Sequence, residues 1–309
     1  MISAISENAD LITHTLTKMS SKAARLHRAA KMRLNNFTTK LASLPQPGSV
    51  QLTVGTTGIA RLTLCNASRR NSLTGPMMAQ LLQQVEALER SDASTWAVVL
   101  SGEGGHFCSG ADLGLALEHV KTHADGLLMS ELMTSILQRF RALPLLSVAA
   151  IDGNAIGGGA ELCTAADWRV VAENGAVQFV QTRMGASTGW GGAARLAEVV
   201  GSRAAALRIL LHQPKLDADA AHACGLADAV GDSGESAADA AERLLLGPAR
   251  EKAASAEAIR AVKSAVSAAT PVTDGAVAAE THAFGRTWGG PANREALARA
   301  AEAIAGKKR

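Results

Sequence analysis

The sequence predicts an α/β fold, and two stretches support this prediction. Val148–Val170 has the pattern of a strand, a turn, a helix and a second strand: an apolar run is followed by the turn residues Asp152, Gly153 and Asn154, and then by a small-residue helix. The residues before it show the order strand, strand, helix, strand. Short apolar strands that alternate with amphipathic helices are typical of α/β domains.

The composition is that of a globular protein of one or two domains. The chain has 309 residues, of which 47% are hydrophobic, but no apolar run approaches the length of a membrane span. Its four cysteines are scattered, which argues against a disulfide framework or a zinc site. The net charge of +3 comes from residues 1–40, because the remaining 24 basic and 26 acidic residues give the body a net charge of −2. This balance argues against nucleic-acid binding.

The N-terminal extension, residues 1–46, precedes the predicted core. Met19–Lys40 is basic, rich in Ser and Thr and free of acidic residues, which is the composition of a mitochondrial transit peptide; an ordinary surface helix is the alternative. Glu7 and Asp10 argue against an import signal that starts at Met1. We therefore favour the cytosol, with the mitochondrial matrix as the second hypothesis.

The predicted core, residues 47–233, begins at the turn residues Pro45–Gly48. Apolar and alternating runs predict its strands, and apolar residues at helical spacing predict its helices. The strands lie at Gln51–Val54, Ile59–Leu64, Trp96–Leu100, Val148–Ile151 and Ala227–Val230. The helices lie at Met77–Leu88, Leu115–His123, Leu127–Leu143, Ala194–Val200, Ala204–Leu211 and Asp217–Cys224.

Residues 234–309 form a predicted helical C-terminal region, because they are rich in alanine and charged residues. Its helices lie at Glu235–Leu246, Arg250–Ala268, Val272–Phe284 and Asn293–Ala305.

The glycine triplet Gly157–Gly159 opens the small-residue helix of the central unit. Three glycines leave no side chain over the first backbone amides, so a ligand can approach them closely. These amides have no partner inside the helix, and the helix dipole favours negative charge there. The triplet fits neither the dinucleotide pattern nor the Walker pattern. It predicts a site for an oxygen that becomes negative, with the Glu161 carboxyl nearby; tight packing of the helix on a sheet is the alternative.

A second glycine loop, Ser101–Leu113, follows the strand that ends at Leu100. Gly110 permits a tight turn that leaves the Ala111 amide pointing outward. Asp112 is a residue type that caps helices or forms turns. The loop therefore offers a second backbone donor.

The two glycine stretches contain F-C-S-G-A-D-L, which begins at Phe107, and G-N-A-I-G-G-G-A-E-L-C-T-A-A-D, which begins at Gly153. Together they resemble the crotonase superfamily of enoyl-CoA hydratases and isomerases. The resemblance implies a core built as a spiral of ββα units and a helical C-terminal trimerisation region, so we expect a homotrimer or hexamer. It also implies an acyl-CoA thioester as the substrate, with coenzyme A as part of that substrate and with no separate cofactor or metal.

The resemblance assigns candidate site residues. The amides of Ala111 and Gly158 match the oxyanion hole that holds the thioester oxygen, in agreement with the donors expected from the glycines. The loop at Ser68, Arg69 and Arg70 matches the place where the family binds the nucleotide part of coenzyme A. The remaining substrate-binding candidates are Ser109, Asp112, Leu113, Gln181, Trp190 and Trp288.

Gln181 stands where the hydratases have their second glutamate, whereas Glu161 matches the first. Hydratases need both carboxylates to position and activate water, and Gln cannot exchange a proton at neutral pH. The substitution argues against hydration and removes one negative charge from the pocket. A substrate that carries its own carboxylate then fits better electrostatically.

Two tryptophan-glycine segments narrow the resemblance: Trp190-Gly191-Gly192, and T-W-G-G-P-A-N, which begins at Thr287. They resemble the ethylmalonyl-CoA decarboxylase branch of the superfamily. The resemblance therefore implies a carbon-carbon lyase that decarboxylates ethylmalonyl-CoA, with methylmalonyl-CoA as a second substrate. Loss of CO2 leaves an enolate, whose oxygen the two amides hold. Glu161 then orients the departing carboxylate or protonates the enolate carbon.

Other functions remain open on the sequence. An enoyl-CoA hydratase or isomerase would use Glu161 alone, and a non-catalytic relative would bind acyl-CoA or RNA without chemistry. Gly185–Gly189 fits the G-x-S-x-G pattern of serine hydrolases, but no convincing apolar strand precedes it. His119 and His123 have the spacing of two metal ligands on one helix face, but no third ligand is apparent nearby.

Overall fold

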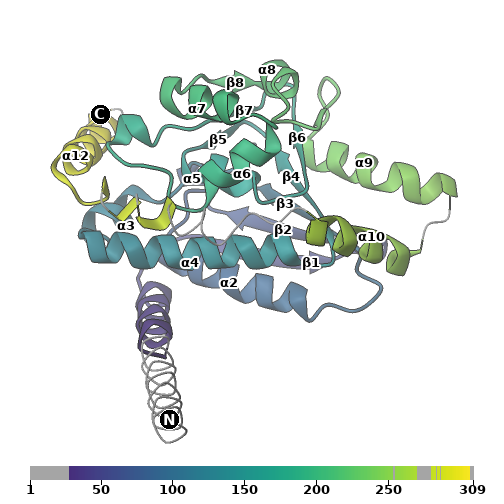
Figure 1. Cartoon of the computed structure of the whole chain (residues 1–309), viewed down its shortest axis with the longest axis horizontal. Coiled ribbons are helices and arrows are strands. Elements are labelled where there is room, and N and C mark those ends of the chain that lie inside the picture. Colours follow the sequence, from purple (N-terminus) through teal and green to yellow (C-terminus); the bar gives the residue numbers. More distant parts are fainter. Residues whose placement is uncertain (1–27, 253–254, 270–279, 283, 286, 307–309) are drawn as a thin grey trace, which may run out of the picture.

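The computed structural model describes residues 28–252, 255–269, 280–282, 284–285 and 287–306, and a six-stranded sheet forms its centre (Figure 1). The strand order is β1-β2-β3-β4-β6-β9; β1 and β2 form an antiparallel hairpin, and each later strand pairs in parallel with its neighbour. This confirms the predicted α/β class. The strands are β1 (Ser49–Val54), β2 (Ile59–Cys65), β3 (Ala97–Gly102), β4 (Leu146–Ile151), β6 (Trp168–Val171) and β9 (Ala229–Val230).

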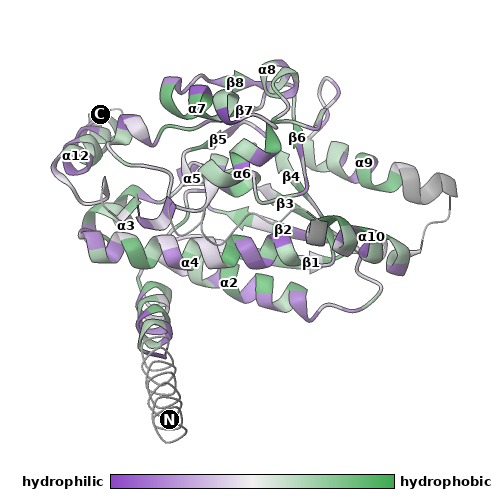
Figure 2. Cartoon of the chain, in the orientation of Figure 1, coloured by the Kyte–Doolittle hydropathy of each residue, from purple (hydrophilic) through white to green (hydrophobic). Residues whose placement is uncertain are grey.

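Both faces of the main sheet are buried, as parallel strands require. Val98 of β3 packs in a cluster with α2 (Gly75–Glu89) and α4 (His123–Ala142), whereas its neighbour Val99 packs in a second cluster with α9 (Ala237–Lys252). This alternation follows from the two-residue period of a strand. Figure 2 shows the sheet strands as largely hydrophobic, while α2 and α4 carry both hydrophobic and hydrophilic residues.

A second sheet of three short strands, in the order β5-β7-β8, was not predicted. β5 (Asn154–Ile156), β7 (Ala176–Gln178) and β8 (Leu216–Asp217) are too short to show a periodic pattern in the sequence. β5 nevertheless has a clear consequence for the site. It directly precedes α5 (Gly158–Cys163), the glycine-rich helix, and so fixes where that helix begins.

Most of the remaining helices agree with the predicted ones to within a few residues. The break between the predicted helices Glu235–Leu246 and Arg250–Ala268 is wrong, because α9 continues to Lys252 and the next helix begins at Ala256. The predicted helix at Val272–Phe284 lies largely outside the described residues. The helices not yet given are α6 (Gly192–Val199), α7 (Arg203–His212), α8 (Ala218–Ala223), α10 (Ala256–Ala269) and α12 (Pro291–Gly306). In Figure 1, α9 and α10 lie at the opposite end of the molecule from α12.

The predicted single helix at Leu115–His123 is wrong at its end. The helix α3 (Leu113–Glu118) stops before His119, and α4 starts a new helix at His123 because Thr122 and Asp125 form a capping box. The two histidines therefore do not share a helix face. Over the part of the chain that the structure describes, no group of three or more His, Cys, Asp or Glu residues is placed to hold a metal ion.

Residues 28–42 form a helix that projects from the body on the side of α2 and α4 (Figure 1). Its end is anchored, because Phe37 and Leu41 are buried in the cluster that includes α2. Residues 19–27 of the segment that resembles an import signal lie outside the described residues, and a helix over the rest of it does not test import, so the import hypothesis stays a prediction. Among the helices described, none has the length and apolar character needed to cross a membrane.

Candidate active site

The two predicted amide donors come together where two loops leave the main sheet. Cys108 pairs with Ala155 of β5 in a parallel bridge, so the loop before Ala111 runs beside the segment that leads into α5. A methyl group on Gly110 would lie only 3.0 Å from the Gly158 nitrogen. Neither the Ala111 N–H nor the Gly158 N–H donates a hydrogen bond to any residue that the structure describes. Two neighbouring donors are thus left open, as an oxyanion hole requires.

Close packing accounts for the glycines at this point. A methyl group on Gly158 would lie 2.4 Å from the Cζ3 atom of the Trp190 ring, and one on Gly159 would lie 2.1 Å from the Cys108 carbonyl oxygen. Both distances are far below van der Waals contact. The packing interpretation of the glycine triplet is therefore confirmed. The same residues leave the Gly158 amide open, and its role in holding an oxygen that becomes negative stays a prediction.

Glu161 of α5 is buried behind the amide pair, with only 2% of its surface exposed. Its Oε2 accepts hydrogen bonds from the Trp190 N–H at 2.7 Å and from the Gly192 N–H at 3.0 Å. The Gly189 N–H lies 3.2 Å from each carboxyl oxygen. Gln181 donates from Nε2 to Glu161 Oε1 at 2.9 Å. The loop of residues 189–192 is therefore folded around this one carboxyl group.

Burial raises the pKa of the Glu161 carboxyl to about 7, and the negative charge of Glu280 adds to the rise. The hydrogen bonds from the Trp190 N–H and from Gln181, and the charge of Arg195, lower this pKa but do not offset burial. A carboxyl group with a pKa near neutrality can both give and take a proton at physiological pH. This is the property expected of a general acid or base.

Gln181 lies beside Glu161, as its alignment with the second acid of the hydratases implies. Its Oε1 atom is buried and has no hydrogen-bond partner among the described residues. The amide can present Nε2 to a charged Glu161 carboxylate, or rotate its oxygen toward a protonated one. Gln181 can therefore serve Glu161 in both charge states, which a second carboxylate cannot do.

The two predicted tryptophans differ in their relation to the amide pair. The Trp190 ring lies against Gly158, directly beside one of the two donors. Trp288 instead packs against α4 at Gly126, donates from Nε1 to the Val120 carbonyl oxygen at 2.8 Å and stacks on Phe284. No contact joins Trp288 to Gly158 among the residues described, so its binding role stays a prediction.

The T-W-G-G-P-A-N segment has a structural role that the sequence did not reveal. Asn293 is buried, accepts a hydrogen bond from the Gly289 N–H at 2.9 Å and donates to the Met184 carbonyl oxygen at 2.8 Å. Met184 ends the short 3₁₀ helix η2 (Thr182–Met184), which begins next to Gln181. The motif thus attaches the C-terminal region to the segment that positions Gln181.

The predicted coenzyme A loop contains a built-in ion pair. Arg69 donates from Nη1 to Asp112 Oδ2 at 2.9 Å, and Ser72 donates to the same oxygen at 3.1 Å. Asp112 is buried and caps the start of α3. Arg69 and Asp112 therefore hold the loop and α3 together. The side chain of Arg69 is half exposed and uses one of its five N–H donors in this pair, so its other donors stay available to a phosphate.

Arg70 is also free to meet a ligand. It is exposed, and its side chain has no partner in the described chain. Ser109 donates from its N–H to the Arg70 carbonyl oxygen at 3.0 Å and from Oγ to the Arg69 carbonyl oxygen at 3.2 Å, so this loop borders the one that contains Ala111. Ser68 is likewise exposed, and Leu113 is half-buried at the start of α3.

Replacing Arg70 with alanine is expected to raise the KM for an acyl-CoA about 1.4- to fivefold at low salt, since an exposed charge pair contributes about 0.2–1 kcal/mol. The increase should shrink at high salt because mobile ions screen exposed charges. Arg69→Ala is the contrasting variant: it should lower Tm, because it removes a partner of the buried Asp112. An unchanged KM in Arg70→Ala at low salt would rule out this contact.

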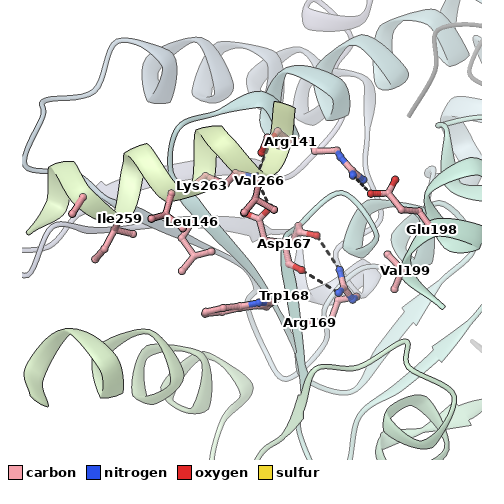
Figure 3. Close-up of a pocket in the computed structure, with 14 residues that line it drawn as sticks. Arg141, Leu146, Asp167, Trp168, Arg169, Glu198, Val199, Ile259, Lys263 and Val266 are labelled. Carbon is pink, nitrogen blue, oxygen red and sulfur yellow. Dashed lines mark hydrogen bonds and ion pairs between the residues drawn. The ribbon is translucent and has the colours of Figure 1, made fainter. Parts of the chain in front are cut away.

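A cavity of about 620 Å³ lies between α10 and the strands β4 and β6, and none of the predicted site residues lines it (Figure 3). Its charged side chains are paired with one another or with neighbours: Arg141 with Glu198, and Lys263 with Asp167. The remaining wall is largely apolar. This cavity therefore offers no unpaired charge for an acyl-CoA, and it is not the candidate active site.

The serine-hydrolase interpretation fails on local structure. A nucleophile elbow needs a strand directly before the serine and a helix directly after it. Gly185 follows the 3₁₀ helix η2 instead of a strand. The Ser187 N–H donates to Thr287 Oγ1 at 3.1 Å, which ties this loop to the T-W-G-G-P-A-N segment.

Arg195 and Glu280 are the site residues that sequence reasoning missed. Both are charged and buried, and both act electrostatically on Glu161. Each lies within a predicted helix, where an isolated charge is expected on the solvent face. No pattern in the sequence distinguishes them, because their burial depends on packing between distant segments.

Comparison with known proteins identifies the protein family of this chain. Residues 55–300 match the family model described as enoyl-CoA hydratase/isomerase, so this chain belongs to that family. This confirms the predicted resemblance to the crotonase superfamily. A crystal structure of an enoyl-CoA hydratase from Mycobacterium avium subsp. paratuberculosis is similar in fold, with a TM-score of 0.70 and 25% identity over 82% of this chain and 100% of that one.

Within the family, the chain is similar to proteins named ethylmalonyl-CoA decarboxylase. The protein from Danio rerio is 42% identical over 264 residues, which cover 84% of this chain and 85% of that protein. The protein from Gallus gallus is 40% identical over 82% of this chain and 84% of its own length.

Proposed function

We propose that this protein decarboxylates ethylmalonyl-CoA, with methylmalonyl-CoA as a second substrate. The observation that supports this most directly is the pair of open amides, Ala111 and Gly158, in a site where the buried Glu161 carboxyl is paired with the neutral side chain of Gln181. Such a site can hold an enolate oxygen and handle one proton, but it lacks the second carboxylate that water addition needs. The relatives from Danio rerio and Gallus gallus carry the matching name.

The reaction starts when the thioester oxygen accepts hydrogen bonds from the Ala111 and Gly158 amides. The bond between the α-carbon and the substrate carboxylate then breaks, CO2 leaves, and the electron pair moves into the thioester to form an enolate. The two donors stabilise the negative charge on the enolate oxygen as it develops. The Trp190 ring, which packs against Gly158, helps keep water from this intermediate.

The second step places a proton on the enolate carbon, and we assign it to Glu161. The raised pKa of this carboxyl means that a substantial fraction is protonated near neutral pH. Its O–H bond breaks as the new C–H bond forms, and the electron pair of the enolate returns to the thioester carbonyl. Gln181 then donates to the resulting carboxylate, and water from solvent restores the proton.

The test is CO2 release from ethylmalonyl-CoA by the purified full-length protein, with the acyl-CoA product identified by mass spectrometry. Release of CO2 together with butyryl-CoA supports the proposal. Crotonyl-CoA hydration in the absence of CO2 release would favour the hydratase alternative. Binding of acyl-CoA without turnover of either substrate would favour a non-catalytic relative.

Replacing Gln181 with glutamate is expected to lower kcat/KM for ethylmalonyl-CoA by about tenfold or more. The variant places a second carboxyl next to Glu161 and next to the substrate carboxylate, and a repulsion of about 1.4 kcal/mol is a tenfold loss. Gln181→Met, which is similar in length and uncharged, is the control for loss of the amide alone. A Gln181→Glu enzyme as active as the wild type would show that the charge of this position does not select the substrate.

Our proposal also includes the oligomeric state of the protein and its compartment in the cell. We expect a homotrimer or a hexamer of the 31.8 kDa chain, measurable by light scattering after gel filtration. We favour the cytosol, and fractionation of cells that express the full-length chain would separate this from the mitochondrial matrix.

A further inference from the structure

Three charged side chains are buried together around the amino end of α6 and the loop that carries Trp190. Glu161 and Arg195 are each 2% exposed, and Glu280 is 7% exposed. They come from three separate parts of the chain: α5, α6 and the C-terminal region. A buried charge is costly unless polar groups compensate it, so two carboxyl groups and one guanidinium in one place call for a physical reason.

The amino end of α6 accounts for both carboxyl groups. Its cap residue, Gly191, has φ +80° and no side chain to accept from the first amides of the helix. Glu161 accepts from the first amide, that of Gly192, at 3.0 Å. Glu280 accepts from the next two, Ala193 at 3.1 Å and Ala194 at 3.2 Å. Two acids from elsewhere in the chain thus replace the missing cap.

Arg195 adds one positive charge without forming an ion pair with either acid among the described residues. Its Nη2 donates to the backbone oxygens of Glu161 at 3.0 Å and Trp190 at 2.8 Å, and its Nε donates to Thr164 Oγ1 at 3.1 Å. With both acids ionised, the three side chains carry a net negative charge in a water-poor site. Uptake of one proton by Glu161 removes that net charge.

Few other groups act on this cluster. The charged groups that face Glu161 are Glu280 and Arg195, and its remaining side-chain partner, Gln181, is neutral. Two further groups face Arg195: Arg141 of α4 and Cys163 of α5. Burial raises the pKa of the Cys163 thiol to about 12, so this thiol stays neutral. Among the described residues that act on Glu161, Glu280 is therefore the one whose negative charge opposes its ionisation.

We propose that Glu280 is a positioning residue that acts through Glu161: it holds the amino end of α6 around that carboxyl group, and its negative charge keeps the proton on Glu161 until the enolate carbon takes it. The part of this inference that concerns the enolate rests on the proposed decarboxylation. In each turnover the proton leaves the Glu161 oxygen, the carbon gains it, and solvent water returns one to Glu161, while Glu280 keeps its charge.

The test follows the titration of Glu161 itself, in full-length protein labelled with 13C at the glutamate carboxyl carbons. The Glu161 resonance is the one that disappears in Glu161→Gln. In Glu280→Gln, which retains an oxygen for the α6 amides, its midpoint should fall by about one pH unit. Glu280→Asp retains the charge and should restore the wild-type midpoint. Glu198→Gln removes a charge from the far end of α6 and should have no effect.

These variants distinguish an effect of the Glu280 charge on Glu161 from a purely structural role of Glu280. An unchanged Glu161 midpoint in Glu280→Gln would overturn the proposal, as would an equal shift in Glu280→Asp. If Glu280→Gln does not fold, Glu280→Met is titrated in its place, because burial alone also raises the Glu161 midpoint of the wild type. An unchanged midpoint in that neutral variant would likewise contradict the proposal. In active enzyme, the pH profile of kcat should shift with the midpoint. A midpoint shift in protein that releases no CO2 would sink the decarboxylase proposal and leave this one standing.

Discussion

Decarboxylation by the Gly158→Ala variant is expected to be about 100- to 1,000-fold slower than by the wild-type protein, which is the usual cost of one lost oxyanion donor. The added methyl group would lie 2.4 Å from the Trp190 ring, so either the ring or the amide must move. Either movement disturbs the donor pair that stabilises the enolate. The effect should appear in kcat from steady-state CO2 release, with a much smaller change in KM, because the hydrogen bonds strengthen in the transition state.

Gly247→Ala is the matched control for that variant. Gly247 is a helical glycine on α9, and outside its own turn of helix no atom of the described residues lies within 4 Å of an added methyl group. The control should keep full activity. Its stability should change little, because the following proline disfavours a helical residue with a Cβ atom and so offsets the higher helix propensity of alanine. A Gly158→Ala enzyme with wild-type kcat would show that the Gly158 amide does not hold the reacting oxygen.

Glu161→Gln is expected to lower kcat by about 100- to 10,000-fold, the range typical of a lost general acid. Glutamine keeps a side-chain oxygen that can accept from the Gly192 and Trp190 amides. Its side-chain amide NH2 can donate to the unpaired Oε1 of Gln181. The variant should therefore fold, and single-turnover product analysis should show slow protonation of the enolate.

Glu161→Ala is the contrasting variant, because it leaves three backbone N–H groups and Gln181 without their acceptor. Each buried donor left unpaired costs about 1–3 kcal/mol, so Tm should fall well below that of Glu161→Gln. If CO2 release survives at the wild-type rate in Glu161→Gln, then Glu161 is a structural cap, and water protonates the enolate.

The raised pKa of Glu161 also predicts a pH dependence of stability. The folded-state pKa of about 7 exceeds the ordinary 4.5, so the folded protein binds more protons than the unfolded chain between these values. The contribution of Glu161 to stability is therefore fully present below about pH 4.5 and is lost as the pH rises through 7. Thermal unfolding of wild type and Glu161→Gln across this window should show the extra slope only in the wild type. Parallel curves would contradict the shift.

The sequence by itself determined the features that depend on residues close together in the chain. The strand patterns of β3 and β4, the glycines that open α5 and the proximity of Glu161 to them are all local, and side-chain size and backbone freedom are sufficient to predict them. The motifs around Ala111 and Gly158 resemble those of the crotonase superfamily, and this resemblance predicted that the two backbone amides lie in one site. The substitution at Gln181 predicted the loss of the second acid.

Only the tertiary structure decided which charged residues are buried and which are bound to one another. Arg69 pairs with the buried Asp112, while the side chain of its neighbour Arg70 has no partner in the described chain, and the sequence does not distinguish these two adjacent arginines. Glu280 is 119 residues from Glu161, and only the packing of the C-terminal region on α6 brings their charges together. Burial depends on contacts between segments far apart in the chain, and electrostatic effects depend on burial, so neither has a local signature in the sequence.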